Sequence, residues 1–236
     1  MLKLLFPKLY LFALKKANNA ILRDEIIHTK LKKINDGESI LDAGCGSQKY
    51  KPHCKHLSYI SQDFGEYKQA QKKSLSDNKP EDYKYGKIDI LGNIWDIKID
   101  SGSIDNILCT EVFEHIPYPI KSLNEFRRIL KKDGKLILSF PASSIRHYDP
   151  YYFYSGFSDR WLEYMLKKNN FKIISLNQVG DYYSWMFEEN FRSFSSASFF
   201  GKLFLIPSLI YFLFKKPDNE SLNTMNQGYI CEAEAI

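Results

Sequence analysis

Several common kinds of functional site and structural framework are missing from this sequence. Its four cysteines form no C-x-x-C pair and match no zinc or iron–sulfur spacing, so we expect reduced thiols and no metal site. The sequence contains no tandem repeat and no low-complexity tract. One nearly unbroken apolar run, Leu203–Phe214, would be about 18 Å long as a helix, whereas a bilayer core measures about 30 Å. These absences argue against a disulfide-stabilised framework, a repeat architecture and a membrane span.

What the sequence does have is an ordinary globular composition with an unevenly placed charge. Of its 236 residues 44% are hydrophobic and 26% charged, which predicts one α/β domain with additions rather than two domains. The net charge is +5, and residues 1–33 alone carry +6, since eight Lys and Arg stand against Asp24 and Glu25. Large aliphatic side chains accompany this charge, which favours a lipid interface over a nucleic acid as partner. Lys8 interrupts the apolar stretch, so it does not match a signal peptide.

Strand and helix patterns alternate along the chain from residue 39 onwards, which is typical of a parallel sheet with crossover connections. Helical spacing after a proline marks Pro119–Lys132, and a second helical segment covers Trp161–Lys168. The expected strands are 39–43, 57–62, 85–90, 104–109, 135–140, 171–176 and 229–235. We therefore predict an α/β fold: a doubly wound, mostly parallel seven-stranded sheet with helices on both faces and an antiparallel last strand.

Two segments fall outside this alternation and determine the expected domain organisation. Residues 1–38 form a basic and apolar helical arm, and residues 179–227 form an apolar helical insertion. The insertion far exceeds the usual connection of about 4–6 residues. Residues 39–178 are then the core, and residues 228–236 add the last strand of its sheet.

The most informative motif is the turn that follows the first expected strand. Asp42 is followed by two glycines with the spacing Gly44-x-Gly46, which allow a tight turn and let a ligand lie against bare backbone. The third glycine of a dinucleotide-binding fingerprint would stand at position 49, where the sequence has Lys49. The turn therefore favours a nucleoside cofactor that lacks a pyrophosphate.

Polar residues also follow the next three strands, and the carboxyl ends of parallel strands meet at one edge of a sheet. Asp63 lies nineteen residues after Gly44, close to the interval at which an acid binds ribose hydroxyls. The segment Gly92–Asp96 is polar and then apolar, which suits the edge and the face of a purine. The segment after the fourth strand combines a hydroxyl, two carboxylates and an imidazole: Thr110, Glu111, Glu114 and His115. We expect these strand ends to form one site.

With these motifs the chain resembles the class I S-adenosylmethionine-dependent methyltransferases. The resemblance rests on Leu41–Gly46, Gln62-Asp63, Ser103–Ile116 and Glu125–Leu138, which cover about residues 39–177 in the order and spacing of that family. In the family the glycine loop cradles the methionine part of the cofactor and the acid after the second strand holds the ribose. The resemblance implies S-adenosyl-L-methionine as cofactor and methyl transfer as reaction.

Carried over residue by residue, the resemblance implies the cofactor-binding residues Asp42, Gly44, Cys45, Gly46, Asp63, Asn93, Ile94 and Thr110. Asn93 stands where many relatives have an aspartate, so its amide oxygen would accept from the adenine amino group. Glu111 and Thr110 would border the methionine tail. The first crossover is short and contains Pro52, so we expect its helix to be reduced to a turn or two.

The acceptor side is expected in the segment Ser144–Phe157 after the fifth strand. Family members with a similar aromatic stretch are placed among surface-glycan and cell-envelope functions. Asp149, Tyr151 and Tyr154 are therefore expected to bind the acceptor, because aromatic faces with hydroxyl tips suit a sugar. The acceptor would be a glycan or a related, lipid-linked small molecule.

A hydroxyl acceptor has to lose its proton, and histidine is the natural base near neutral pH. The hypothesis is that His115 or His147 takes this proton, with Glu111 or Asp149 orienting the ring.

Two other functions remain open from the sequence: an NAD-dependent oxidoreductase on the same fold, and a catalytically silent, cofactor-binding membrane adaptor. No nucleic acid is expected as partner. Residues 1–16 and 199–216 are expected either to contact a membrane peripherally or to pack together as a lid or homodimer face. The expected location is the cytoplasm, at the inner face of the membrane.

Overall fold

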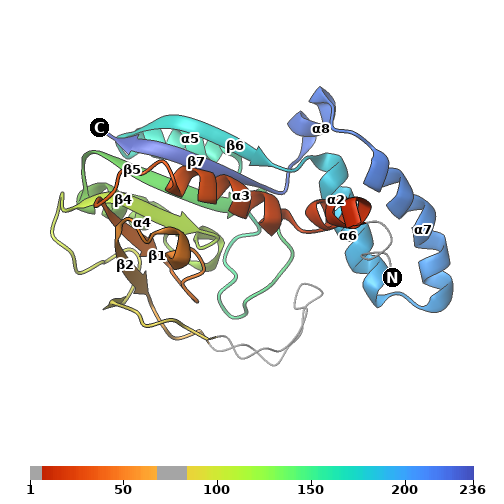
Figure 1. Cartoon of the computed structure of the whole chain (residues 1–236), viewed down its shortest axis with the longest axis horizontal. Coiled ribbons are helices and arrows are strands. Elements are labelled where there is room, and N and C mark those ends of the chain that lie inside the picture. Colours follow the sequence, from red (N-terminus) through yellow and green to blue (C-terminus); the bar gives the residue numbers. More distant parts are fainter. Residues whose placement is uncertain (1–6, 68–83) are drawn as a thin grey trace. The chain divides into compact units, whose positions relative to one another are not determined.

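The computed structural model describes residues 7–67 and 84–236 and confirms the predicted α/β fold (Figure 1). Contacts divide the chain into two compact units. We call them the sheet unit (Ile26–Asn177 and Tyr229–Ile236) and the helical unit (Met1–Glu25 and Gln178–Gly228). The strands are β1 (Ser39–Ala43), β2 (Ser58–Asp63), β3 (Ile90–Leu91), β4 (Ile104–Thr110), β5 (Leu130–Pro141), β6 (Phe171–Val179) and β7 (Gly228–Ala235).

The seven strands form one sheet in the order β3-β2-β1-β4-β5-β7-β6. Strands β1 to β5 pair in parallel, and β7 lies antiparallel between β5 and β6, as predicted for the last strand. Chain order reverses between β1 and β4, which pair directly through Leu41 and Ile107. In open α/β sheets ligands bind beyond the carboxyl ends of the strands at this point. The turn after β1 and the segment after β4 therefore lie at the expected binding edge.

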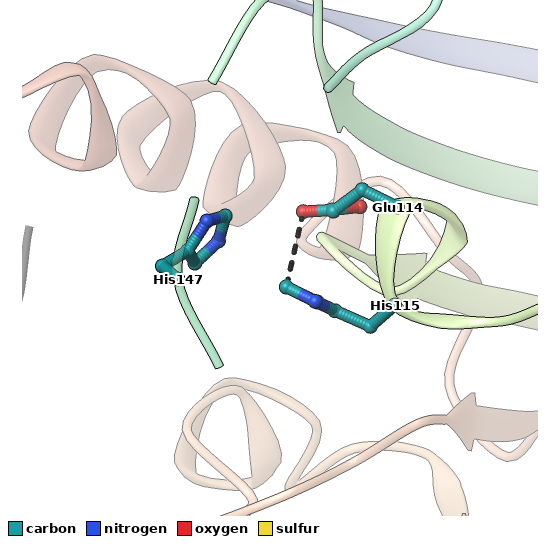
Figure 2. A group of neighbouring side chains, drawn as sticks. All are labelled: Glu114, His115 and His147. Atoms are coloured by element: carbon teal, nitrogen blue, oxygen red, sulfur yellow. Dashed lines mark ion pairs between the residues drawn. The ribbon is translucent and has the colours of Figure 1, made fainter. Parts of the chain in front are cut away.

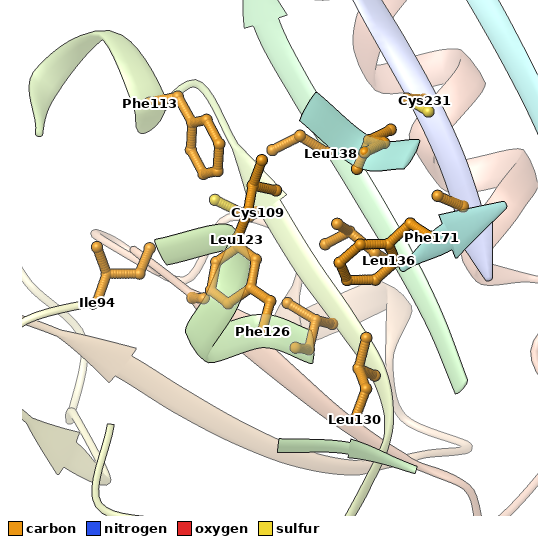
Figure 3. Close-up of a cluster of buried hydrophobic side chains, with 14 of the residues drawn as sticks. Ile94, Cys109, Phe113, Leu123, Phe126, Leu130, Leu136, Leu138, Phe171 and Cys231 are labelled. Atoms are coloured by element: carbon orange, nitrogen blue, oxygen red, sulfur yellow. The ribbon is translucent and has the colours of Figure 1, made fainter. Parts of the chain in front are cut away.

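Helices cover both faces of the sheet because side chains alternate across each strand. On one face, strand residues pack against α4 (Pro119–Ile129) and α5 (Asp159–Lys168). Figure 3 shows this cluster, in which Leu123 and Phe126 of α4 lie against Leu136 and Leu138 of β5. On the other face the neighbouring strand residues are equally buried, and α3 (Asn19–Leu31) contributes two fully buried side chains: Ile27 and Leu31.

Three local expectations are corrected or confirmed by this structure. The third strand was predicted as 85–90 but is only Ile90–Leu91, since the backbone N–H of Ser61 donates to the side chain of Asp89 and not to a backbone carbonyl, and the hydroxyl of Ser61 donates to the same carboxylate. The helix predicted to reach Lys132 ends at Ile129, and β5 begins at the next residue. The short first crossover is confirmed: it holds one 3₁₀ turn, η1 (Lys51–His53).

The helical unit consists of α2 (Pro7–Ala17), α6 (Tyr182–Ser196), α7 (Phe199–Phe214) and α8 (Asn219–Thr224), with the start of α3. The ammonium of Lys16 at the end of α2 donates to carbonyl oxygens in and just after the last turn of α7, those of Phe212 (2.6 Å), Leu213 (3.1 Å) and Lys215 (2.7 Å). A cation at a helix C-terminus satisfies carbonyls that lack helical partners. Within the described ranges, no helix is both long and apolar enough to cross a membrane.

Candidate active site

The turn after β1 has a conformation and a packing that require glycine. Gly44 and Gly46 have φ angles of +76° and +50°, and the N–H groups of Gly44 and Cys45 donate to the carbonyl of Gln62 at 2.8 and 3.0 Å. A Cβ on Gly44 would lie 2.5 Å from a methyl carbon of Val112, which follows β4. The turn therefore brings bare backbone against the segment after β4, at the point where the strand order reverses.

Asp63, at the end of β2, is tied to this turn through its carboxylate. One oxygen accepts from the N–H of Gly46 at 2.9 Å and the other from the N–H of Gly65 at 3.0 Å. The residue is only 5% exposed, and burial raises its pKa although these amide bonds oppose the rise. Each carboxylate oxygen has a second lone pair. Asp63 can therefore accept further hydrogen bonds from a ligand while it holds the turn.

Asp42 precedes this turn and Cys45 belongs to it, and burial raises the pKa of both side chains. Burial raises the pKa of Asp42 to about 7, although the hydroxyl of Tyr59, which donates to it at 2.6 Å, opposes the rise. Burial and then the nearby carboxylates of Asp42 and Asp63 raise the pKa of Cys45 to about 12. Cys45 is therefore a neutral thiol, and what it can offer a ligand is its backbone.

The two residues expected to meet an adenine lie in different surroundings. Asn93 is exposed, whereas Ile94 is 5% exposed and belongs to the core cluster (Figure 3). The preceding residue, Gly92, is held on both sides: its N–H donates to the carbonyl of Asp63 at 3.0 Å, and its carbonyl accepts from the side-chain amide of Gln62 at 2.6 Å. The strand end that carries Asn93 is thus fixed beside the Asp63 carboxylate.

After β4 the chain places Thr110 and Glu111 beside β5. Thr110 is the last residue of β4, and Glu111 follows with a φ of +53°. Its N–H donates to the carbonyl of Ser139 at 3.0 Å, and its carboxylate accepts from the hydroxyl of Ser139 at 2.9 Å. A positive φ in a residue other than glycine is uncommon and strained, and it is found at functional sites.

The two histidines proposed as bases lie together (Figure 2). Their ring centres are 4.7 Å apart, although His115 ends η2 (Phe113–His115) and His147 lies in the loop after β5. The Nδ1 atom of His115 is 2.6 Å from the carbonyl of Tyr151, and that of His147 is 2.8 Å from the carbonyl of Ile145. Burial and the neighbouring His147 lower the pKa of His115 to about 4. His115 is therefore neutral near pH 7.

The carboxylates around these rings differ from the expectation. Asp149 accepts from the guanidinium of Arg146 at 2.8 Å, and backbone carbonyls, not Asp149, hold the Nδ1 atoms of both rings. The carboxylate beside His115 is that of Glu114, 3.6 Å from its Nε2 atom. The sequence pattern assigns Glu114 no role, because nothing local to it shows that its carboxylate is buried beside a histidine.

The two tyrosines expected to bind an acceptor have different environments. The ring of Tyr151 makes an edge contact with Phe64, with centres 5.0 Å apart. Tyr154 packs against the core, and its hydroxyl donates to the carbonyl of Pro117 at 3.3 Å. Packing alone accounts for Tyr154, while Tyr151 belongs to an aromatic group beyond the end of β2.

Comparison with known proteins shows the family of this chain. Residues 15–204 match the family described as Methyltransferase domain. The chain belongs to this family. The match includes the Gly44–Gly46 turn, Asp63 and the segment that carries Glu114 and His115. An uncharacterized protein of Methanocaldococcus jannaschii is 34% identical over 116 residues, which are 48% of this chain and 46% of that protein. The chain thus matches less than half the length of this curated relative.

Solved methyltransferase structures resemble the fold at low sequence identity. Phosphoethanolamine N-methyltransferase 2 of Haemonchus contortus, in complex with S-adenosyl-L-methionine, has a TM-score of 0.53 and 15% identity; the alignment covers 90% of this chain and 52% of that one. Geranyl diphosphate methyltransferase, in complex with GPP and sinefungin, has a TM-score of 0.56 and 11% identity, over 91% of this chain and 77% of that one. At such identities the likeness establishes the fold, and the acceptors in these names belong to those proteins.

Proposed function

We propose that this chain is an S-adenosyl-L-methionine-dependent methyltransferase that methylates an oxygen of a glycan or a related, lipid-linked small acceptor. The observation that carries the proposal is the Gly44–Gly46 turn, which is joined to the Asp63 carboxylate at the reversal of strand order in a chain of the methyltransferase-domain family. The expected cofactor-binding residues are those that surround this turn.

The turn fits the proposed cofactor on two counts. A Cβ on Gly44 would overlap a methyl carbon of Val112, so the chain can make this tight turn against the segment after β4 only with glycine. The Asp63 carboxylate, already oriented by two backbone N–H groups, retains lone pairs for the two hydroxyls of a ribose. When bound, S-adenosyl-L-methionine supplies a methyl group activated on a sulfonium. The protein's own contribution is then to orient an acceptor oxygen in line and to exclude water, which is worth up to several kcal/mol.

The acceptor side is proposed to be the segment that carries Glu111, His115 and His147, together with the loop residues Asp149 and Tyr151. The imidazoles lie together and the aromatic rings around them offer flat surfaces for a sugar. A pKa of about 4 makes His115 a weak base at neutral pH. Methyl transfer to extracted envelope glycans tests this half of the proposal, and absence of transfer in the presence of bound cofactor would favour a silent adaptor.

Calorimetry with S-adenosylhomocysteine and with NAD tests the cofactor half. We expect S-adenosylhomocysteine to bind and NAD not to bind. The variant Gly44→Ala should weaken S-adenosylhomocysteine binding at least tenfold, because its Cβ meets Val112 and its φ is positive. Gly37→Ala is the matched control, since Gly37 has a φ of +84° but a Cβ there meets no described atom within 4 Å. Binding of NAD in preference to S-adenosylhomocysteine would instead assign an oxidoreductase.

We also propose that the helical unit attaches the enzyme to an anionic membrane surface through the segments 1–16 and 199–216. Residues 1–6 lie outside the described part of the chain, so the support comes from α2 and α7. All sixteen residues of α7 are described, none is buried, and Lys202, Lys215 and Lys216 flank its apolar run. An apolar helix with flanking lysines suits the boundary of an anionic lipid bilayer. The expected location is therefore the inner face of the membrane.

Flotation with liposomes that contain anionic lipid tests this attachment. We expect the protein to float at low salt and to float less as salt screens the lysines. A protein that remains at the bottom at low salt would contradict the attachment and favour the alternative, in which these segments form a homodimer face.

A further inference from the structure

Three side chains of the proposed acceptor side bring metal-ligating atoms together. Glu114, His115 and His147 place one carboxylate oxygen and two imidazole nitrogens within 4.8 Å of one another (Figure 2). Glu114 is 1% exposed and both histidines are partly buried, so the three groups converge in a largely solvent-excluded place.

The backbone determines which nitrogen of each imidazole is available. A carbonyl oxygen can only accept a hydrogen bond, so the Nδ1 atoms that face the carbonyls of Tyr151 and Ile145 must carry the hydrogen. In the neutral rings the Nε2 atoms of His115 and His147 then carry the lone pairs. This arrangement, in which Nδ1–H is bound to a carbonyl and Nε2 is left as donor of a lone pair, is the usual one for histidines that ligate metals.

The Nε2 atom of His115 lies near an oxygen that also carries lone pairs. Its Nε2 atom is 3.6 Å from a carboxylate oxygen of Glu114, which is too long for a hydrogen bond. Two ligand atoms bound to one zinc ion at about 2.1 Å stand about 3.4 Å apart in tetrahedral geometry. A cation between these two atoms thus fits the observed spacing. A shift on the order of 1 Å would bring the ligand atom of His147 to the same spacing, since the three ligand atoms lie within 4.8 Å of one another.

The protein backbone holds these ligands in place independently of any ion. The N–H groups of Phe153 and Tyr154 donate to the carbonyl of Glu114 at 2.9 and 3.2 Å. These bonds tie the loop after β5, which carries His147, to the 3₁₀ turn that carries the other two ligands. Orientation of ligands by such outer contacts is typical of metal sites.

We propose that Glu114, His115 and His147 bind a divalent transition-metal cation, of which zinc and manganese are the representative cases. Two imidazoles and one carboxylate are the ligand set of catalytic zinc sites and leave coordination positions open. The role of the ion rests on the proposed function: the acceptor hydroxyl binds it and loses its proton to water at lower pH. The acceptor oxygen then forms the C–O bond as the S–CH₃ bond breaks, and the electron pair of that bond stays on sulfur.

Cobalt(II) is the probe that tests the site, since its visible absorption reports coordination by nitrogen and oxygen ligands. Tag-free full-length protein should bind one cobalt ion per chain, with zinc competing for the same site. His147→Ala and Glu114→Gln should each weaken cobalt binding at least tenfold. His53→Ala is the matched control, because His53 stacks on His28 outside the cluster. This variant should bind cobalt with the affinity of the wild type.

Further readouts separate this proposal from the proposed function. S-adenosylhomocysteine should bind equally well with and without EDTA, because the ion contacts the acceptor and not the cofactor. If the protein binds cobalt but not S-adenosylhomocysteine, the proposed metal site stands and the proposed cofactor is wrong. Cobalt affinity that is unchanged in His147→Ala, or absent from the wild type, overturns the metal site. His147 lies in a partly exposed loop, so this variant decides the matter even where Glu114→Gln fails to fold.

Discussion

The sheet unit and the helical unit use their apolar residues in opposite ways. In the sheet unit, large apolar side chains such as Phe113, Phe126 and Phe140 are fully buried. In the helical unit, α7 is also rich in large apolar residues but buries none of them. It exposes eight large apolar side chains: Phe199, Phe200, Leu203, Phe204, Ile206, Ile210, Tyr211 and Phe214. The sheet unit is therefore stabilised by its own core, whereas α7 leaves a large apolar surface exposed, a feature that often marks interaction sites.

The strongest way to test this contrast is to remove one phenylalanine from each unit. Phe126→Ala should lower the free energy of unfolding by about 3–5 kcal/mol, because it leaves a cavity among fully buried side chains. Phe204→Ala, at a residue that is 84% exposed, should change it by less than about 0.5 kcal/mol. Urea unfolding monitored by tryptophan fluorescence measures both. A similar loss for the two variants would show that α7 is covered in solution, for example by a second copy of the chain.

The pH dependence of stability should also differ between the units. Asp42 of the sheet unit has a folded pKa of about 7, above the ordinary 3.8, so its carboxyl favours folding at low pH and this contribution is lost as pH rises through about 7. Replacing it with asparagine should remove a destabilisation on the order of 4 kcal/mol above pH 8. Urea unfolding at a series of pH values checks this, and parallel curves for wild type and Asp42→Asn would contradict it.

Asp218, which caps α8 in the helical unit, should behave in the opposite way. Its pKa is lowered, chiefly because its carboxylate accepts from the backbone N–H of Ser221. Its contribution is therefore present above about pH 4 and lost as pH falls through the folded pKa. Asp218→Asn should lose part of this acid sensitivity, and a variant as acid-sensitive as the wild type would exclude the cap as its source.

A smaller effect is expected when a single exposed side chain is changed in the flotation assay. Phe204→Ser should reduce binding to anionic liposomes about tenfold, the order expected when one phenylalanine no longer enters the lipid boundary. Tyr164→Ser is the matched control, because Tyr164 is also well exposed but lies on α5 of the sheet unit. Equal flotation of all three proteins would mean that α7 does not carry the attachment.

Much of the fold follows from local sequence, because side-chain periodicity and turn residues act over short distances. β1 matches its predicted range, and the parallel order with an antiparallel last strand is confirmed. The errors arise where long-range contacts override the local pattern. The carboxylate of Asp89 takes the place of a backbone partner for Ser61, and β5 begins at residues whose pattern predicts the end of α4.

The candidate site divides in the same way. The sequence by itself determined the glycine turn and the acids at neighbouring strand ends, since a positive φ at Gly44 and the edge of a parallel sheet are local or topological consequences. Only the tertiary structure decided that Asp63 is bound to Gly46, that burial moves the pKa of Asp42 and His115, and that the loop after β5 brings His147 to Glu114 and His115. Burial and convergence depend on which segments pack together, and no spacing along the chain encodes that.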